Sequence, residues 1–586
     1  MTVLKSIKLT FFSLFFLFSL NSFSQFSKTH YIPPISTSGQ GSSSAEIQYL
    51  YVSTPNESPI NVVITPIGGT PLAVTVSNSE PYEYFMGDGN DTNFIALSGD
   101  SGQVYTNKGF IIEGEDLIYV SARLFTSDAY YQAAGLVSKG LAALGKTFRV
   151  GTFESVGNDP AGNFLNFVSV LATEDNTIVN FSDFPNGATI INNAATNDIL
   201  LNSGESYVIA IQPTSVNPDN DNAMIGVLVE SDKPIAVNSG SITGSNQNTD
   251  TDANGQDAGI DQIVPLERVG TEYIFVRGIG PDQIERPLIV AHEPDTEVYV
   301  NGTLEFTIAQ AGEHWSIPSS FYGVSYDQYQ VGPEIGESSN MYVQTSKPAF
   351  AYQFLGGIRP GVEGPFGIGT GVPNQGMFFV PPINCQTPSV VNNIAAINKL
   401  GPDYEFEGVV TIVTETGSTV LINGNDISDY PGGVQPVNGN ALFESYTVEG
   451  LTGNVSVEST SQVYVASFGA YDYATFGGYY SGFAYQPEII LDEISVDSEG
   501  CIPNLELRLN SISTFDQYQW YFNGEMIDGA VGNSFTPTEP GYYQISGAVD
   551  DCPGLLLSDD IPVSACPPDT DSDGVNDNID IDIDND

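Results

Sequence analysis

The chain has 586 residues, and 16 Lys and Arg stand against 71 Asp and Glu, which gives a formal net charge of −55. At about 100 to 200 residues per domain this length predicts several domains, and 33 Phe with 30 Tyr supply apolar surface for large cores, which excludes a disordered polyanion. The scarcity of basic residues also excludes nucleic acids and anionic lipid as partners. The three histidines, His30, His292 and His314, argue against a His-rich zinc site or a Ser-His-Asp triad.

Residues 1–24 have the organisation of a secretory signal peptide. Lys5 and Lys8 precede an apolar run over residues 9–20, and Ser22 and Ser24 are the small residues expected before a cleavage point at Gln25. No later apolar run reaches the roughly 18 residues of a membrane helix. We therefore expect an exported protein that is extracellular or on the cell surface, with no membrane-spanning segment.

The region from residue 25 to 487 contains an internal repeat. A polar residue, twice a Lys-Pro pair, precedes an alternating apolar strand at residues 116–120, 233–237, 347–351 and 461–465, at intervals of about 115 residues. The sequence predicts four copies of one unit. The interval is too long for a solenoid and suits a tandem β-sandwich, with a large propeller-like blade as the second choice.

Two more markers recur with the same period. The strand after the polar residue is the first marker. The second marker is a pair of strands joined by a polar turn, at residues 168–180, 288–302 and 409–424 with a looser copy at 62–76, and its composition is typical of a hairpin. The third marker is a glycine followed three residues later by an aromatic residue, at Gly145, Gly270 and Gly401. The one fair helix candidate, residues 131–144, is interrupted by glycine and serine and predicts one or two short turns at most, so the fold class is all-β.

Some of these runs resemble a known family. Residues 231–240, 261–265 and 269–273, with the similar stretches 144–148 and 379–382, resemble the conserved runs of the IgGFc-binding-protein N-terminal domain family. The resemblance covers roughly residues 30 to 485. It implies an extracellular recognition module with no catalytic residues to carry over, and it does not imply that this chain binds immunoglobulin.

Residues 488–566 have the character of a separate small β-domain. Cys501, Trp520, Tyr543 and Cys552 follow one another in an order that resembles an immunoglobulin-like sandwich, and that resemblance implies a disulfide between Cys501 and Cys552. Cys385 and Cys566 stay unassigned, because connectivity does not follow from sequence.

The strongest chemical motif lies in residues 567–586. Carboxylates at positions 1, 3, 5, 9 and 12 of a twelve-residue loop, with Gly574 at position 6, supply the hard oxygens and the tight turn that calcium needs. The motif resembles a truncated thrombospondin type 3 repeat, which implies calcium ligands at Asp569, Asp571, Asp573, Val575 through its carbonyl, Asp577 and Asp580. The alternative is a solvated acidic tail.

A second loop has the same kind of spacing. Asp250, Asp252, Asn254 and Asp261 place oxygens at positions 1, 3, 5 and 12 of a second candidate calcium loop. The alternative is an ordinary surface turn, since Asn, Asp and Gly are also the residues of turns.

These observations predict a secreted, non-catalytic adhesion or recognition protein whose C-terminal linker is stabilised by calcium and whose ligand is a glycan or a protein surface. The order of modules resembles large exported proteins of gliding bacteria. In those proteins a C-terminal sorting domain follows such a linker and attaches the protein to the outer surface. Because this sequence stops inside an acidic repeat, we expect it to be a fragment of a longer protein that is attached through such a domain. Two alternatives stay open: an extracellular polysaccharide-acting enzyme that uses paired carboxylates, and a purely structural surface spacer.

Overall fold

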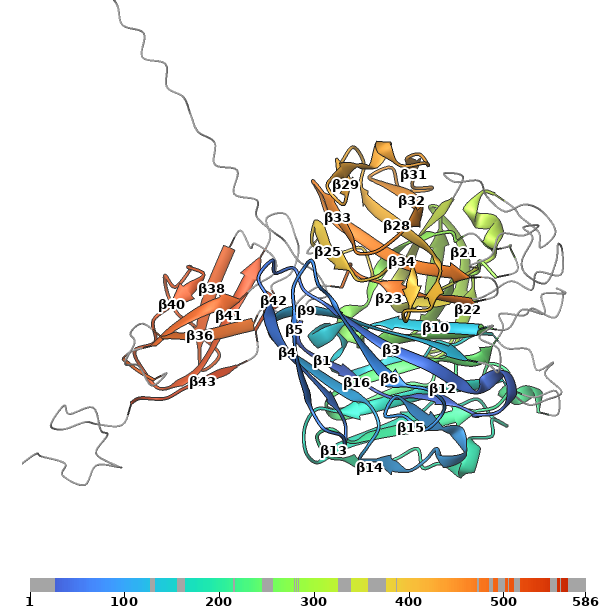
Figure 1. Ribbon diagram of the computed structural model, residues 1–586, viewed down its shortest axis with the longest axis horizontal. Coiled ribbons are helices and arrows are strands. Elements are labelled where there is room, and N and C mark those ends of the chain that lie inside the picture. The colour runs from blue at the N-terminus through green and yellow to red at the C-terminus, as the bar shows by residue number, and fades with distance from the viewer. Residues whose placement is uncertain are drawn as a thin grey trace, which may run out of the picture.

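The computed structural model describes a chain of strands and short 3-10 turns, in which the described residues contain no α-helix (Figure 1). These residues are 27–126, 132–154, 164–213, 217–244, 257–278, 280, 282, 284–324, 339–356, 376–385, 387–471, 474–483, 488–493, 501–503, 505–510, 517–548, 556–558 and 560–566. The predicted all-β class is confirmed. The predicted signal peptide and the acidic C-terminal loop lie outside the described residues.

One seven-stranded unit forms the first repeat. Its strands are β1 (Ser27–Ile32), β3 (Ala45–Ser53), β4 (Ile60–Pro66), β5 (Leu72–Val76), β6 (Tyr82–Gly87), β9 (Phe110–Thr126) and β10 (Gln132–Val137). The long strand β9 belongs to two layers. Its first part pairs with β1 and β4, and its second part pairs with β3 and β10. β5 extends the first layer and β6 the second, so the unit is a two-layer sandwich whose layers share one strand.

The same seven strands recur three times. The second repeat has β11 (Gly145–Arg149), β12 (Leu165–Ala172), β13 (Thr177–Ser182), β14 (Ile199–Leu201), β15 (Ser206–Ile211), β16 (Leu228–Gly244) and β17 (Asp257–Ile263). The third has β18 (Gly270–Val276), β19 (Leu288–Ala291), β20 (Thr296–Val300), β21 (Thr303–Ile308), β22 (His314–Ser316), β23 (Asn340–Leu355) and β24 (Gly376–Phe379). The fourth has β25 (Val390–Ile394), β28 (Glu407–Glu415), β29 (Val420–Ile422), β30 (Asn425–Asp426), β32 (Phe443–Leu451), a long strand divided into β33 (Val455–Ser459) and β34 (Val463–Tyr471), and β35 (Ala474–Tyr479).

Short elements fill the connections between these strands. They are β2 (Ile35–Thr37), β7 (Ile95–Leu97), β8 (Val104–Tyr105), β26 (Lys399–Leu400), β27 (Tyr404–Glu405), β31 (Gln435–Pro436) and the 3-10 turns η1 (Gly41–Ser43), η2 (Ser98–Asp100), η3 (Gly140–Ala143), η4 (Ile191–Asn193), η5 (Pro218–Asn220), η6 (Leu266–Arg268), η7 (Ser319–Tyr322) and η8 (Ile427–Asp429). The segment 131–144, for which the sequence allows one or two short turns at most, contains β10 and the single turn η3 in its described residues.

The first sequence marker corresponds to the point where the long strand passes from one layer to the other. Residues 116–120, 233–237 and 347–351 lie within β9, β16 and β23, beside register shifts in the pairing with β1, β11 and β18. Residues 461–465 begin in the gap between β33 and β34. A proline suits this corner, because it has no N–H to donate to a ladder.

The second marker is not a hairpin in any of its three close copies. β12 and β13 do not pair with each other, because Val170 of β12 pairs with Val237 and Val179 of β13 pairs with Ser231, both on β16. β19 and β20 are arranged in the same way around β23, and β28 and β29 lie in different sheets. The polar turn therefore carries the chain across the sandwich. The looser copy at 62–76 does form a hairpin, β4 with β5.

The third marker has a packing cause in the second and third repeats. A Cβ on Gly145 would come within 2.3 Å of Pro265, and one on Gly270 within 2.6 Å of Pro382, so each glycine admits a proline from the segment that begins the next repeat. Gly401 instead lies in the turn between β26 and β27 at a φ of +68°, where it packs against Tyr49 of the first repeat.

The four sandwiches close into a ring around their last strands. β10 contacts β17 and β35, and β24 contacts the same two strands, so the four innermost strands form a closed circuit. In Figure 1 the first repeat, in blue, accordingly lies beside the fourth, in orange. The units are sandwiches, as predicted, whereas their closed arrangement has the character of the propeller-like alternative.

Two buried carboxylates of β17 connect the repeats at the centre of the ring. Asp257 accepts hydrogen bonds from the backbone N–H of Ala133 in β10 at 2.9 Å and of Thr475 in β35 at 3.0 Å. Asp261 accepts one from the backbone N–H of Phe379 in β24 at 2.9 Å and forms an ion pair with Lys139 at 2.6 Å, both side chains being fully buried. Four repeats thus meet at one strand.

Arg123 joins the first repeat to the fourth. Its guanidinium donates to the carbonyl oxygens of Ala395, Ala396 and Lys399 at 2.6–2.8 Å and lies over the ring of Phe476 in β35, 4.7 Å from the centroid. Because Arg123 is only 2% exposed, these bonds are formed away from water, where an unpaired charge would be costly.

Residues 488–566 form a second unit with its own core. Its strands are β36 (Glu488–Glu493), β37 (Leu505–Asn510), β38 (Gln517–Phe522), β39 (Glu525–Met526), β40 (Ser534–Phe535), β41 (Gly541–Ala548), β42 (Leu556–Leu557) and β43 (Ile561–Val563), arranged in two sheets. Trp520 is fully buried in this core and donates from Nε1 to the carbonyl of Gly532 at 2.9 Å.

The predicted disulfide is wrong in its second member. Cys501 pairs with Cys566, 65 residues further along the chain, instead of Cys552. The reason is the path of the last strand, because Ile502 forms a bridge with Ala565 and the N–H of Cys566 donates to the carbonyl of Ile502. The bond therefore joins the two ends of this unit. Cys385 is also disulfide-bonded.

Replacing the central carboxylate should destabilise the ring. Asp257→Ala leaves the N–H groups of Ala133 and Thr475 without this acceptor in a buried site, so we expect a loss of about 2–4 kcal/mol in the free energy of unfolding. Urea unfolding measures it, with the exposed Asp88→Ala as the matched control. A loss below 0.5 kcal/mol, roughly what a surface substitution gives, would contradict a central role for Asp257.

The buried His30 should make the fold sensitive to acid. Its ring bonds Ser138 and the carbonyl of Ile118, and burial lowers its pKa from 6.5 to about 4. Between those pH values the unfolded chain binds the proton and the folded chain does not. The stability that neutral His30 contributes is therefore lost as the pH falls from 6.5 to 4, by about 3 kcal/mol in total. We expect wild type to lose more free energy of unfolding than His30→Gln between pH 7 and pH 4. Equal losses would show that His30 is not the cause.

Candidate functional site: a pocket in the fourth repeat

An aromatic residue lies at the same register position in every repeat. It is on the strand that extends the second layer, opposite an aliphatic residue that in turn pairs with the long strand. The four pairs are Tyr82 with Val52, Tyr207 with Val170, Trp315 with Ile289 and Tyr446 with Ile412. Because the same partner order recurs, these four aromatic residues occupy equivalent places at the side of their sandwiches.

The first layer has the same strand pairing in three repeats. A valine of β4, β13 or β20 pairs there with an apolar residue of the next strand, and these pairs are Val62 with Val74, Val179 with Ile199 and Val298 with Phe306. In the third repeat the ring of Phe306 stacks on Trp315, with centroids 5.1 Å apart and planes 12° from parallel. The side of this sandwich is closed by a side chain of its own.

The fourth repeat lacks that closing strand. β29 pairs with β30 only through Leu421 with Asp426 and Ile422 with Asn425. The residues that would continue the strand opposite Val420 belong to the 3-10 turn η8, whose Ile427 is half-buried against the core cluster of Val420. No aromatic side chain stands here in the place that Phe306 has in the third repeat, and a pocket lies beside Tyr446.

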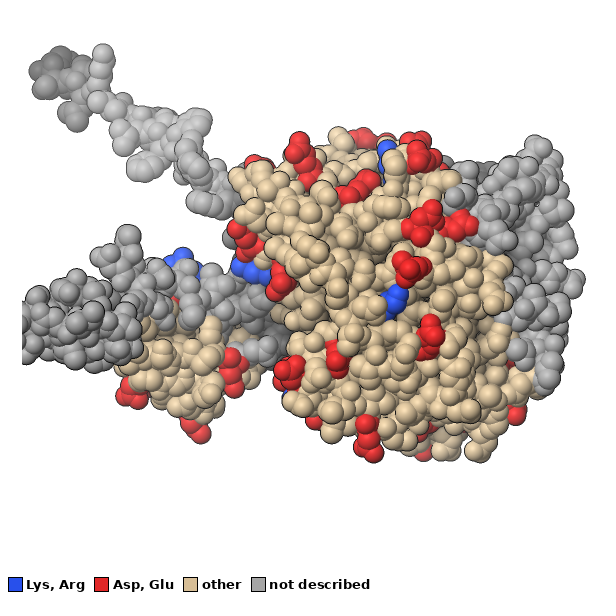
Figure 2. Space-filling view, turned by 60° about the horizontal axis from the view of Figure 1, so that its bottom comes forward, with Lys and Arg blue, Asp and Glu red and all other residues tan. Residues whose placement is uncertain are grey.

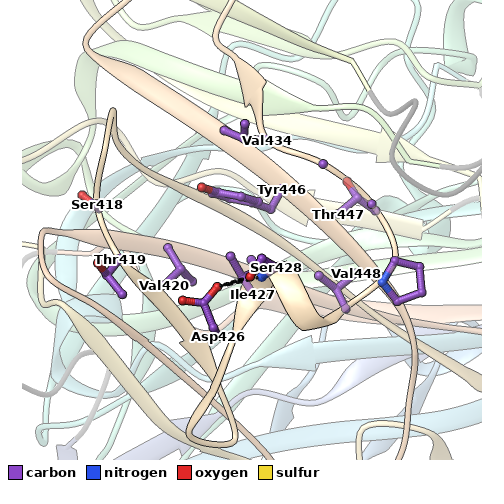
Figure 3. Close-up of a pocket in the computed structure, with 13 residues that line it drawn as sticks. Ser418, Thr419, Val420, Asp426, Ile427, Ser428, Val434, Tyr446, Thr447 and Val448 are labelled. Atoms are coloured by element: carbon purple, nitrogen blue, oxygen red, sulfur yellow. Dashed lines mark hydrogen bonds between the residues drawn. The ribbon is translucent and has the colours of Figure 1, made fainter.

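The result is a pocket of about 360 Å³ (Figure 3). It is lined by Ser418, Thr419, Val420, Asp426, Ile427, Ser428, Pro431, Gly432, Gly433, Val434, Tyr446, Thr447 and Val448. Val420 and Val448 are buried and form the apolar floor, and Figure 3 shows Tyr446 between the segment of Val434 and η8. A half-exposed aromatic ring over an aliphatic floor, with hydroxyl groups at the rim, can hold a flat apolar group and orient it by hydrogen bonds.

The electrostatics of the pocket favour a neutral or cationic ligand. Asp426 Oδ1 accepts hydrogen bonds from the Ser428 hydroxyl at 2.7 Å and from the Ser428 N–H at 2.9 Å, which lower the pKa of Asp426. Burial raises the pKa of Tyr446, and so does its hydrogen bond to Glu444 Oε1 at 2.9 Å, so the phenol stays neutral and its ring is held in place. Figure 2 shows acidic side chains scattered over one face of the molecule, with few basic ones.

The pocket lining contains one carboxylate, that of Asp426. Asp426 and Tyr446 are the only ionisable residues among the described residues that line it. A glycosidase needs two carboxylates that face each other across the substrate, and this lining supplies one.

A second charged cluster lies between the second and third repeats. His314 Nε2 lies 3.4 Å from Glu154 Oε1, and Arg286 lies 3.9 Å from the same carboxylate. Burial alone would raise the pKa of Glu154, but the hydrogen bond to His314 and the charge of Arg286 together hold it below its usual range. The cluster joins two repeats, and we assign it to the packing of the ring.

The structure corrects one predicted calcium ligand. Both carboxylate oxygens of Asp261 face donors, namely Lys139 and the N–H groups of Gln262 and Phe379, so Asp261 is no ligand of a surface loop. The other members of that loop, Asp250, Asp252 and Asn254, lie outside the described residues. So do all six predicted ligands of the C-terminal loop, from Asp569 to Asp580.

The sequence analysis missed the pocket, although a signal for it exists. After the Asn-Gly turn at residue 301 the third repeat continues with the alternating run Thr303–Ile308. After the equivalent Asn-Gly turn at residue 423 the fourth repeat continues with a segment rich in Asp, Ser, Pro and Gly, which are turn residues. Aligning the repeats by their strands reveals this difference.

Comparison with known proteins identifies the family. The model of the family described as IgGFc binding protein matches residues 134–469, more than half of the chain, and this protein belongs to that family. The match begins in β10 and ends in β34, so it extends from the edge of the first repeat into the fourth. No curated protein matches the chain.

Solved structures resemble the chain only distantly. The central fibronectin-III array of RIM-binding protein is 12% identical over 51% of this chain and 99% of its own length, with a TM-score of 0.13. Immunoglobulin domains 1–5 of Sidekick-1 are 9% identical over 92% of this chain and 100% of their own length, with a TM-score of 0.10. At these TM-scores the likeness supports no conclusion about this chain. Among the described residues no helix has the length and apolarity to cross a membrane.

Proposed function

We propose that this protein is a secreted or cell-surface recognition protein that works by adhesion and not by catalysis. The ring of four sandwiches is its scaffold, and the pocket beside Tyr446 is its contact site. The observation that carries the proposal is the difference between equivalent repeats: a place closed by Phe306 in the third repeat is an open pocket of about 360 Å³ in the fourth. A concave site with an apolar floor and a polar rim is the usual form of a ligand-binding site.

The scaffold suits this role. Buried bonds at β17 and at Arg123 fix the repeats to one another, so the contact site is carried on a rigid body. Membership of the IgGFc-binding family and the disulfide between Cys501 and Cys566 fit an extracellular protein. The ligand of the pocket is a protein surface or a glycan, and immunoglobulin is one candidate among protein ligands.

The C-terminal part supplies the link to a surface. We infer an immunoglobulin-like unit over residues 488–566, supported by the buried Trp520 and by Tyr543, whose hydroxyl donates to the backbone carbonyl of Glu539 at 2.8 Å. We also infer a calcium-stabilised linker over residues 567–586, supported by the spacing of its carboxylates.

A large side chain that fills the pocket should weaken ligand binding. We expect the mature protein to bind members of an array of extracellular glycans and proteins, and Ser428→Phe to weaken that binding at least tenfold because it places a ring where Phe306 lies in the third repeat. Thr452→Phe, which places the same ring at an exposed position outside the pocket lining, is the matched control and should bind like wild type. An array that wild type does not bind would favour the spacer alternative, and binding that Ser428→Phe leaves intact would place the contact site elsewhere.

The calcium proposal has its own test. Calorimetric titration of calcium into the mature protein should give a heat of binding that disappears when the chain is truncated after Pro567, a position that keeps Cys566 and its disulfide. Asp571→Ala with Asp573→Ala should have the same effect, because each removes an expected ligand. Heat that survives the truncation would assign calcium to another site, and no heat at all would mean that the tail is a charged linker.

A further inference from the structure

The open edge of β29 shows how a ligand can attach beside the pocket. In the third repeat all five residues of β20 pair with β21, from Thr296 with Ile308 to Val300 with Thr303. In the fourth repeat the pairing with β30 ends at Leu421, so the edge from Ser418 to Val420 has no strand on that side among the described residues. An unpaired edge is a template for an added strand.

The third repeat shows what the added strand would carry. Phe306 is opposite Val298 on β20, and its ring stacks on Trp315. Val420 and Tyr446 are the equivalents of Val298 and Trp315, and both line the pocket. A strand at the open edge that placed an aromatic side chain opposite Val420 would therefore stack that ring on Tyr446.

The charges around the pocket indicate which residue the added strand would carry beside its aromatic residue. Asp426 is exposed at the end of the β29–β30 ladder, next to the place where the added strand would begin, and Asp429 is exposed in η8. The sequence from 387 to 483 holds a single basic residue, Lys399. A Lys or Arg beside the aromatic residue of the ligand would meet Asp426, whereas an acidic residue there would be repelled.

We propose that the pocket binds an extended segment of a partner protein, which adds to the edge of β29 as an antiparallel strand and places one aromatic side chain on Tyr446 and a neighbouring basic side chain at Asp426. The inference rests on the proposed function and specifies its ligand as a peptide segment instead of a sugar. Backbone hydrogen bonds supply affinity in this mode of binding, and the aromatic pocket supplies specificity.

The chain itself provides a probe. A capped synthetic peptide with the sequence of residues 303–308, in which Glu305 is replaced by lysine, carries Phe306 and a basic neighbour. Fluorescence anisotropy of the labelled peptide with the mature protein should show saturable binding. The peptide with Phe306→Ala should bind at least tenfold more weakly, and the unmodified sequence with Glu305 should bind more weakly at low salt, where charge effects are largest.

Protein variants separate the pocket from the rest of the surface. Ser428→Phe should weaken peptide binding at least tenfold, while Thr452→Phe, at an exposed position outside the pocket lining, leaves it unchanged. Gly433 also lines the pocket, and a Cβ there would meet nothing within 4 Å, so we expect Gly433→Trp to fold and to block the pocket a second way. Thr452→Trp, outside the lining, is its control. Asp426→Asn should reduce affinity for the lysine peptide only.

The outcomes distinguish this inference from the proposed function. Peptide binding that depends on Phe306 and is blocked by Ser428→Phe and Gly433→Trp supports both. Binding of a glycan to the wild type that the same two variants abolish, together with no binding of the peptide, overturns the inference and leaves the proposed function standing. Peptide binding that neither variant changes overturns the assignment of the pocket.

Discussion

The arrangement of the four sandwiches depends on the two aspartates of β17. Each sandwich could fold around its own apolar interior, but a ring requires that four strands meet at close range, where backbone N–H groups have no water. Asp257 and Asp261 accept N–H groups from β10, β35 and β24, and Lys139 balances one of the charges. Because one strand holds acceptors for the other three, the second repeat is the hub and the ring closes around it. The small residues of the inner strands permit the approach: a Cβ on Gly135 would lie 3.0 Å from the backbone N of Gly477.

The sequence predicted the all-β class, the four repeats and their period, because alternation and turn residues are local properties of a chain. It did not predict which strands are neighbours. Residues 168–180 have the composition of a hairpin, yet β12 and β13 flank β16, since the turn crosses between layers. Nor could it predict the partner of Cys501, because that depends on the path of the last strand. The role of Asp261 was also out of reach, because its spacing from Asp250 fits a calcium loop whether the side chain is at the surface or, as here, in a buried ion pair with Lys139.

The pocket illustrates how function can arise from repetition. All four repeats keep an aromatic residue at one place, and in the third repeat Phe306 of β21 stacks on it. In the fourth, a short segment of turn residues follows β30 where β21 continues as a strand, and Tyr446 lines a pocket. The site was invisible to motif analysis because its residues, Tyr, Val, Ser and Asp, have no reactive pattern. The difference between the segments after the Asn-Gly turns at residues 301 and 423 acquires its meaning once the repeats are aligned by their strands.

The bonds of Arg123 have a mechanical consequence. They join the first repeat to the fourth, which are the two ends of the ring along the chain, and the guanidinium contacts three carbonyl oxygens at once. A force that pulls the first and fourth repeats apart would load the three hydrogen bonds of Arg123 at the same time and not one after another. The ring would therefore keep its length under tension until these bonds broke together, and it would then lengthen in a single step. For a protein that holds one surface to another, such a threshold would limit the range of forces over which the attachment stays short.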